Sequence, residues 1–433
     1  MKRLYTLLLT CALFAATTSL SAQESEGGSG NASTPQAVGA RSAGVAASTV
    51  QADSASTAVA DTTFVVSLLT CSPGQETYEL YGHTAIRVQN AAEGIDYVFN
   101  YGAFSFQQPH FIWRFVLGEC DYMVIAEHFN EFLVEYERRG SSVTEQVLNL
   151  SPAEALDLAV RLNDNIQPAN CVYRYNIFRN NCTTKARDII EASIRGKVVY
   201  PARPRRNSFR TILHEFTRGH AWAREGNDLL LGASVDTAIV ERDEMFSPIY
   251  MMNYADSAFI DAGNYKLRPL VASRTELLAA NPDRQAEEAA RQPSVPLSPA
   301  AIGWGLLVVG LLVACWEWRR GRICWPVDAV LTTLQGVAGL LLTFMAVASE
   351  HPGVASNWQV WVLNPLPLLF LPWVVKADIK RQSHIYHSFA AVWLAAFVLL
   401  YAVLPQHFSQ LILPVALLLL SRAIVHLIIY KKS

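Results

Sequence analysis

The final third of the chain constrains the fold most, because it consists of long apolar segments separated by short polar loops. Five such segments lie near residues 300–317, 327–348, 357–375, 388–404 and 408–430. Each is close to the roughly 20 residues that an α-helix needs to cross a bilayer. None shows the polar face that a surface helix of a water-soluble protein carries. The sequence therefore predicts an all-α bundle of five transmembrane helices over residues 299–430.

Basic residues in the loops predict how these helices are oriented. They follow the first, third and fifth segments, as Arg319, Arg320, Arg322, Lys376, Lys380, Arg381, Lys431 and Lys432. The loops 349–356 and 405–407 contain neither Lys nor Arg. Because Lys and Arg concentrate on the cytoplasmic side, we expect the C-terminus in the cytoplasm and the preceding domain across the inner membrane. Arg422 and His426, inside the last segment, are expected to reach toward the cytoplasmic interface.

The amino-terminus predicts export independently of the loops. Lys2 and Arg3 precede a short apolar run over residues 4–16, and small residues at 20–22 resemble a cleavage site. This pattern predicts a signal peptide over residues 1–22, since the apolar run is shorter than a membrane span. Residues 23–61 are rich in Ser, Ala, Gly and Thr. Such a composition buries little apolar surface and predicts a disordered linker.

Residues 62–280 have the pattern of a mixed α+β exported domain. The runs 63–70, 84–88 and 96–101 are rich in β-branched and aromatic residues and predict strands. Residues 129–139 and 152–165 have helical periodicity, and Ser151 with Pro152 is typical of a helix start. A third helix is expected from Cys182 to Glu191, and residues 281–298 read as a linker. Lys+Arg (35) and Asp+Glu (37) nearly balance, which gives no reason to expect nucleic-acid binding.

Cys182 is the strongest candidate for chemistry in the exported domain. Cys71, Cys120 and Cys171 share that domain, and disulfides among the four are the ordinary expectation outside the cytoplasm. Cys182, however, follows Asn180-Asn181 where a loop enters a predicted helix. Free N–H groups and the helix dipole lower the pKa of a thiol at that position, and the thiolate is the nucleophile.

His83 is the candidate base for this thiol. The domain also contains His110, His128, His214 and His220, but His83 follows Gly82 at the start of a predicted strand. A glycine there permits close backbone approach and a fixed imidazole. On the neighbouring strand either Asn100 or Asp96 can accept a hydrogen bond from the imidazole and orient it, the third role of a triad.

Metal and cofactor chemistry are not predicted. His214-Glu215 with His220 resembles a zinc signature, but positions i and i+6 do not share a helix face. The sequence has neither a G-x-S-x-G nucleophile elbow nor a phosphate-binding glycine loop. We therefore expect no cofactor and no metal ligands.

Four stretches resemble the Lnb N-terminal periplasmic domain family: Tyr81-Gly82-His83-Thr84, Asn100-Tyr101-Gly102, Asn181-Cys182-Thr183-Thr184 and WAREGNDLLLG at 222–232. The resemblance covers about residues 64–262 and extends to the trailing membrane bundle. A histidine-bearing strand that precedes an Asn-Cys helix start also resembles the circularly permuted NlpC-type, papain-like group of amidases and acyl hydrolases. That resemblance implies a permuted papain-like fold, with Cys182 as nucleophile, His83 as base and Asn100 as the orienting group. Relatives with histidine at the third position make Asn100 the least specific match.

Two functions follow as expectations. The first is a membrane-anchored periplasmic thiol hydrolase or acyltransferase acting on an amide or ester of an envelope component, such as a peptide, peptidoglycan or an acyl lipid. The second is a non-catalytic envelope binding or assembly protein in which Cys182 is structural. A disulfide from Cys182 to another cysteine would favour the second function.

Overall fold

The computed structural model describes residues 63–104, 109–263, 266–292 and 295–430. The expected signal peptide (1–22) and linker (23–61) lie outside these residues. Contacts divide the described chain into two units. We call residues 63–216 with 238–292 the sheet unit, and residues 217–237 with 295–430 the helical unit; each is described by itself.

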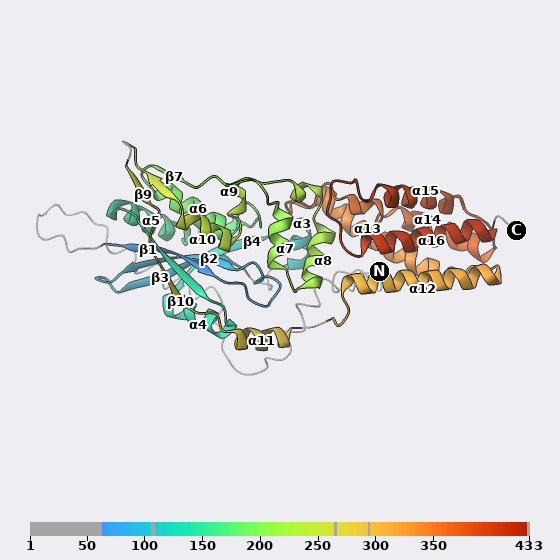
Figure 1. Ribbon diagram of the computed structural model, residues 1–433, viewed down its shortest axis with the longest axis horizontal. Coiled ribbons are helices and arrows are strands. Elements are labelled where there is room, and N and C mark those ends of the chain that lie inside the picture. Colours follow the sequence, from blue (N-terminus) through green and yellow to red (C-terminus); the bar gives the residue numbers. More distant parts are fainter. Residues whose placement is uncertain (1–62, 105–108, 264–265, 293–294, 431–433) are drawn as a thin grey trace, which may run out of the picture. The chain divides into compact units, whose positions relative to one another are not determined.

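The sheet unit is built on an antiparallel sheet of seven strands (Figure 1). Their order in the sheet is β10-β5-β1-β2-β3-β4-β6. The strands are β1 (Val65–Cys71), β2 (His83–Asn90), β3 (Ile95–Ala103), β4 (Asp121–His128), β5 (Val143–Leu148), β6 (Val172–Arg174) and β10 (Val271–Leu278). Each of the three strands predicted from sequence forms, and β1, β2 and β3 pair in that order.

Helices cover both faces of this sheet. On one face lie α5 (Pro152–Asn165), α6 (Cys182–Ser193) and α10 (Pro248–Asp256), and on the other lies α4 (Phe129–Arg139). Consecutive residues of β1 therefore pack on opposite faces. Leu68 lies on the face covered by α5, α6 and α10, and Leu69 lies on the face covered by α4. A strand covered on both faces needs apolar residues without alternation, and this explains the continuous run at 63–70.

The helices predicted at 129–139 and 152–165 have the expected bounds. The start of α5 is a capping box, in which Ser151 Oγ accepts from the Glu154 N–H and the Glu154 carboxylate accepts from the Ser151 N–H. Helix α6 begins at Cys182, as predicted, and continues to Ser193.

Smaller elements complete the sheet unit. They are α3 (Phe111–Leu117), α7 (Phe209–Phe216), α9 (Glu241–Glu244), α11 (Pro282–Arg291) and a second sheet of β7 (Lys197–Val199), β8 (Phe259–Asp261) and β9 (Leu267–Pro269). Helix α11 lies inside the expected linker 281–298. Asn281 caps it by accepting from the N–H groups of Asp283 and Arg284, and none of its residues is buried.

The helical unit contains the apolar helices of the C-terminal region. They are α12 (Pro299–Arg320), α13 (Trp325–Ala348), α14 (Leu366–Ile379) preceded by η2 (Trp358–Trp361), α15 (Ile385–Leu400) and α16 (Ile412–Tyr430). Among the described residues four helical segments are long and apolar enough to span a membrane, with η2 and α14 counted as one segment. The prediction of five spans is therefore corrected to four. Helix α15 has 16 residues, or about 24 Å at 1.5 Å per residue, which is short of a ~30 Å hydrocarbon core.

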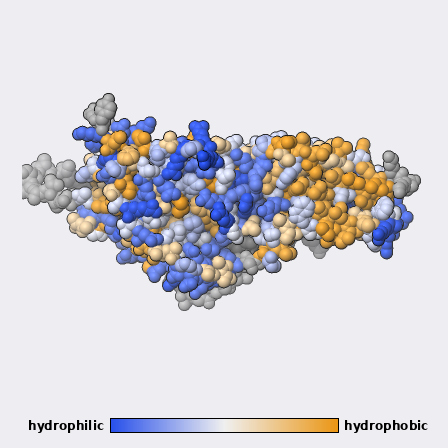
Figure 2. Space-filling model, viewed as in Figure 1, coloured by the Kyte–Doolittle hydropathy of each residue, from blue (hydrophilic) through white to orange (hydrophobic). Residues whose placement is uncertain are grey.

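Figure 2 shows apolar side chains gathered over these helices. Leu312 and Trp318 of α12 and Val347 of α13 are among the exposed apolar residues. Such a surface suits lipid rather than water. Arg422 and His426, expected to reach toward the interface, are instead 4% and 1% exposed and both contact Asp328 inside the bundle.

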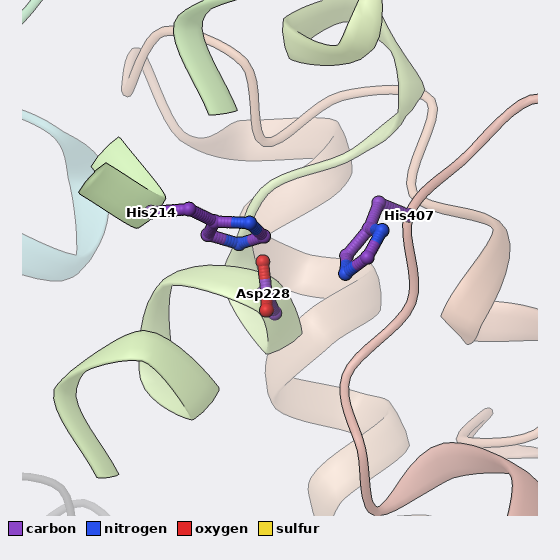
Figure 3. Close-up of side chains that lie close together, drawn as sticks. All are labelled: His214, Asp228 and His407. Carbon is purple, nitrogen blue, oxygen red and sulfur yellow. The ribbon is translucent and has the colours of Figure 1, made fainter. Parts of the chain in front are cut away.

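Residues 217–237 belong to the helical unit, although a boundary at residue 280 would assign them to the exported domain. They contain α8 (Ala221–Leu230) and η1 (Ala233–Asp236). Buried amide side chains satisfy their backbone, because Gln359 Nε2 donates to the carbonyl of Asp228 at 2.7 Å and Asn357 Nδ2 to that of Leu229 at 2.9 Å. On α8, Asp228 has a carboxylate oxygen within 4.8 Å of a ring nitrogen of His407, from the loop before α16 (Figure 3).

Candidate functional site

Cys182 is the first residue of α6, and the preceding Asn181 fixes its position. Asn181 Oδ1 accepts from the N–H groups of Thr183 and Thr184 at 3.0 and 2.9 Å. Thr184 Oγ1 in turn accepts from the Asn181 N–H at 2.8 Å. The Asn181 side-chain amide donates to the carbonyls of Ile177 and Phe246, each at 2.8 Å. This buried N-cap therefore ties the helix start to two other segments of the sheet unit.

His83 is the first residue of β2, and Gly82 explains how the chain brings it there. Gly82 has φ +75°, and a Cβ at this position would lie 2.7 Å from the carbonyl oxygen of Cys71. A larger residue would therefore be strained and would collide with β1. Gly102 plays a similar part on β3, where φ is +96° and an added Cβ would lie 3.8 Å from Cys182 Cβ and 4.0 Å from His83 Cε1. Gly82 therefore lets the chain enter β2 against β1, and Gly102 takes a left-handed conformation beside both Cys182 and His83.

The His83 imidazole is oriented by a chain of hydrogen bonds on one face of the sheet. His83 Nε2 lies 2.6 Å from Asn100 Oδ1, and Asn100 Nδ2 donates to Glu127 Oε1 at 3.0 Å. Because Glu127 accepts from the amide nitrogen, the amide oxygen of Asn100 faces the imidazole as an acceptor. Nε2 of His83 then carries the proton, and Nδ1 is left to accept one from the thiol.

The electrostatics of Cys182 and His83 are coupled. Burial raises the pKa of Cys182, but the charge of His83, a hydrogen bond to His83, the Thr84 N–H and the Thr183 hydroxyl lower it, to about 7. Burial lowers the pKa of His83, but the charge of Cys182 and hydrogen bonds to Cys182 and Asn100 outweigh burial and raise it. The arrangement therefore stabilises a thiolate–imidazolium pair near neutral pH.

Cys71 shows that burial by itself raises the pKa of a thiol. It lies opposite His83 in the β1–β2 register and is fully buried. Burial raises the pKa of the Cys71 thiol, which is inert by comparison with Cys182. All six cysteines of the described residues are free, so Cys182 is in no disulfide with Cys71, Cys120 or Cys171. The disulfide that would favour a structural role for Cys182 is not formed.

A pocket of about 140 Å³ opens beside Cys182 and His83. Its lining is mostly aromatic, from Tyr78, Tyr81, Phe104, Tyr122, Tyr175, Phe216 and Phe246. No Asp, Glu, Lys or Arg lines it. A pocket of this kind favours an uncharged, apolar group next to the nucleophile.

The structure brings the three predicted residues Cys182, His83 and Asn100 together, while their catalytic roles stay predictions. It also decides between the two candidate acceptors for the imidazole. Asp96 forms an ion pair with Arg87 at 2.7 Å and lies opposite Gln89, at the far end of β2 from His83. Sequence reasoning missed Glu127, because its contact with Asn100 depends on the register of β3 with β4.

The site has few ligands for a metal ion. Nε2 of His83 is occupied by Asn100. Among the described residues, no group of three or more His, Cys, Asp or Glu side chains with metal-ligand spacing includes His83 or Cys182. A protein zinc site takes at least three such ligands. The arrangement is thus suited to nucleophilic rather than metal-assisted chemistry.

Comparisons with known proteins place the chain in a family. Neither a curated protein nor a solved structure matches it. The Lnb N-terminal periplasmic domain matches residues 51–213, and the Lnb transmembrane domain matches residues 290–433. The first match contains the Cys182 site, and the second contains the four apolar spans. The chain therefore belongs to the Lnb family, as a membrane-anchored envelope protein with a periplasmic domain and a transmembrane domain.

Proposed function

We propose that this protein is a membrane-anchored thiol hydrolase or acyltransferase that forms an acyl-enzyme on Cys182. The observation that carries the proposal is the placement of Cys182 and His83 beside the same uncharged pocket, with His83 held by hydrogen bonds through Asn100 to Glu127. A nucleophile, a base within reach and a third group that orients the base are the requirements of covalent acyl transfer. The permuted papain-like fold is part of the proposal, supported by the order of the histidine strand before the cysteine helix.

The reaction has two steps. In the first, His83 Nδ1 takes the thiol proton and Cys182 Sγ attacks the carbonyl carbon of an ester or amide, forming a tetrahedral oxyanion. Its collapse forms a thioester and releases the alcohol or amine, which receives the proton from His83. In the second, water or an acceptor amine or alcohol loses a proton to His83 and attacks the thioester carbonyl. This step returns the thiol and releases the acid or the transferred acyl product.

The oxyanion would be stabilised at the start of α6. The Asn181 side chain uses the N–H groups of Thr183 and Thr184, and the Asn181 carbonyl accepts the Lys185 N–H. The Cys182 N–H is the donor of the first turn that remains beside the nucleophile. A backbone N–H next to the nucleophile, backed by the helix dipole, is a common component of oxyanion holes. Mutation of the Asn181 cap would disturb this donor through the helix start.

The pocket supports an acyl group rather than a charged peptide as the part of the substrate that binds beside Cys182. A cavity of roughly 150 Å³ lined by apolar side chains is enough to hold benzene. At about 140 Å³ this pocket takes a group of similar size, such as the carbonyl end of an acyl chain. An ionised side chain of a peptide or of peptidoglycan would lack a counter-charge there. The transmembrane domain ties the protein to a membrane, which is a source of lipid esters.

The inner membrane is the proposed location. The spans are α-helical, and basic residues lie in the last turns of α12 and α14 and in the loops that follow, at Arg319, Arg320, Arg322, Lys376, Lys380 and Arg381. These two loops are therefore proposed to face the cytoplasm. Alkaline phosphatase fused after residue 321 should be inactive, whereas the same fusion after residue 353 should be active; the reverse pattern would refute this orientation.

A thiol-reactive activity probe on the full-length protein in detergent tests the catalytic proposal. The probe should label wild type and Cys171→Ala equally, and Cys182→Ala should lose the label. The same three proteins are then given nitrophenyl esters of increasing acyl length, with and without an amine acceptor. Turnover that requires Cys182 supports the enzyme, and acyl transfer to the amine distinguishes a transferase from a hydrolase. Equal labelling and equal turnover by Cys182→Ala would leave the non-catalytic binding function.

A further inference from the structure

A cluster of ionisable side chains lies inside the transmembrane bundle, away from the Cys182 site. Helices α12 to α16 all contribute to it, through Glu317, Asp328, Asp378, His387, Arg422 and His426. Each residue is at most 6% exposed. Ionisable residues inside membrane helices are costly, and a cluster drawn from every helix indicates a function or a bound ligand.

One half of the cluster is held together by ion pairs of Arg422 with Glu317 and Asp328. Arg422 Nε donates to Asp328 Oδ1 at 2.7 Å, and its Nη2 donates to Asp328 Oδ2 at 2.8 Å and to Glu317 Oε1 at 2.9 Å. This bidentate contact gives Asp328 a fixed geometry. His426 Nε2 lies 3.0 Å from Asp328 Oδ2, so the same carboxylate also fixes the orientation of this ring.

The other half of the cluster lacks hydrogen bonds. Neither carboxylate oxygen of Asp378 has a hydrogen-bond partner, and the same holds for His387 Nε2 and His426 Nδ1, although all four atoms are buried. His426 Nδ1 lies 3.2 Å from Asp378 Oδ1, and His387 Nε2 lies 3.9 Å from the same oxygen. Buried donors and acceptors that face one another without hydrogen bonds are what a site for a cation presents when only the protein atoms are considered.

The net charge of the cluster also favours a bound cation. Glu317, Asp328 and Asp378 contribute three carboxylates, and Arg422 contributes one guanidinium. With neutral imidazoles the cluster is short of two positive charges, in a setting where unpaired charge is strongly disfavoured. One divalent cation makes the balance neutral.

We propose that Asp378, His387 and His426 bind a divalent transition metal ion, with zinc as the best fit to two imidazoles and one carboxylate. The ligand atoms all lie within 4.8 Å of one another. Zinc bonds of about 2.0–2.2 Å at tetrahedral angles put neighbouring ligand atoms about 3.3–3.6 Å apart. The observed separations of 3.2 and 3.9 Å bracket that range.

The rings of His387 and His426 are stacked, with centroids 3.7 Å apart and planes at 14°, so one ring turns when both nitrogens bind the same ion. One further contact supports His426 as a ligand. Asp328 holds Nε2 of His426, the arrangement in which a carboxylate orients a metal-bound histidine through its second nitrogen. The metal would join α14, α15 and α16, including α15, which is too short to span the bilayer by itself.

The experiment uses the full-length protein purified in detergent without chelators. Wild type and His384→Asn, a change at the half-buried N-cap of α15, should both contain zinc in equimolar amount by elemental analysis. His387→Gln and His426→Gln should lose it, with a zinc Kd raised by at least the roughly 10–100-fold seen when outer-shell partners are removed. Cobalt added to the chelator-treated wild type should give the intense visible absorption of a tetrahedral site.

The cobalt spectrum keeps the test valid if a glutamine variant fails to fold, because it is recorded on wild type. Absence of zinc from wild type together with absence of a cobalt spectrum would overturn the proposal, and the cluster would then be an internal ion-pair network. Unchanged zinc affinity in folded His387→Gln and His426→Gln would overturn it as well. The readouts are independent of any activity of Cys182.

Discussion

Replacing His83 with glutamine should strongly reduce the reactivity of Cys182 at neutral pH. In the wild type the pKa of this thiol is about 7, against an ordinary 9.0, because His83 outweighs the effect of burial. A pKa lower by about two units raises the thiolate fraction at pH 7 by about 50-fold. The thiolate is lost as the pH falls through about 7, so reactivity should decline below that value.

The expected change in rate is smaller than the change in ionisation. Thiolate nucleophilicity falls with pKa at a slope of about 0.5, which offsets roughly 10-fold of the gain. The net effect on alkylation at pH 7 is therefore about 5-fold when the pKa returns to its ordinary value. It will be larger if burial raises the pKa in His83→Gln above the ordinary value, as burial does for Cys71.

The assay follows iodoacetamide modification of the peptide that contains Cys182 by mass spectrometry, from about pH 5 to about pH 10, a range that includes both pKa values. Cys171 in the same protein is the internal reference. His128→Gln is the matched control, since His128 is exposed and its side chain makes no cap hydrogen bond. A wild-type midpoint near 9, or equal rates for the wild type and His83→Gln at pH 7, would refute the proposed pairing.

Three further changes test the surroundings of the thiol. Asn100→Ala should lower turnover or probe labelling by roughly 10–100-fold, because removing a partner of a buried imidazole costs about 1–3 kcal/mol; an unchanged rate would show that Asn100 does not position His83. Asn181→Ala should lower the Tm by about 2–8 °C, because loss of the cap costs about 1–2 kcal/mol. Asn281→Ala, which removes an exposed cap, should lower the Tm by less. Calorimetry compares the two variants, and equal shifts would contradict the role of burial. Gly102→Ala, at φ +96° beside Cys182, should cost about 1–2 kcal/mol in denaturant unfolding and slow the alkylation, while Gly94→Ala, with open space around it, should leave the alkylation rate unchanged.

Local sequence signals predicted the positions of Cys182 and His83 well. A helix start is encoded within a few residues, so Asn181 followed by Cys182 was sufficient to place the thiol at the N-terminus of α6. The pair Gly82-His83 similarly marked a strand start with close backbone approach. Both signals are short-range, and short-range chemistry is what a single sequence displays most directly.

The sequence alone did not show which residues of neighbouring strands contact each other. Asp96 and Asn100 are four residues apart and lie on the same face of β3, so alternation does not distinguish them. Only the register of β3 against β2 shows that Asn100 is near His83 and that Asp96 is near Gln89. Glu127 was missed for the same reason, since β4 follows β3 only after α3.

The membrane helices were located correctly, but their polar interior was missed. Glu317, Asp328 and Asp378 lie at or just beyond the ends of the predicted apolar segments, next to basic loops, where charged residues are expected in any membrane protein. His387 lies one residue before the segment predicted at 388–404. The burial of these residues depends on how α12 to α16 pack together, and hydropathy does not report packing.

The chain's connectivity has a consequence for anyone who truncates this protein. Within the described residues it passes between the two units three times, after residue 216, after residue 237 and between residues 292 and 295. A periplasmic fragment ending near residue 280 would retain α8 but lose Gln359 and Asn357, whose amides satisfy the carbonyls of Asp228 and Leu229. Those carbonyls would face water, and the buried Glu225 of α8 would lose the N–H groups of Gln410 and Leu411 that donate to its carboxylate. Replacing residues 217–237 with a short Gly-Ser linker is therefore the better way to obtain a soluble periplasmic domain.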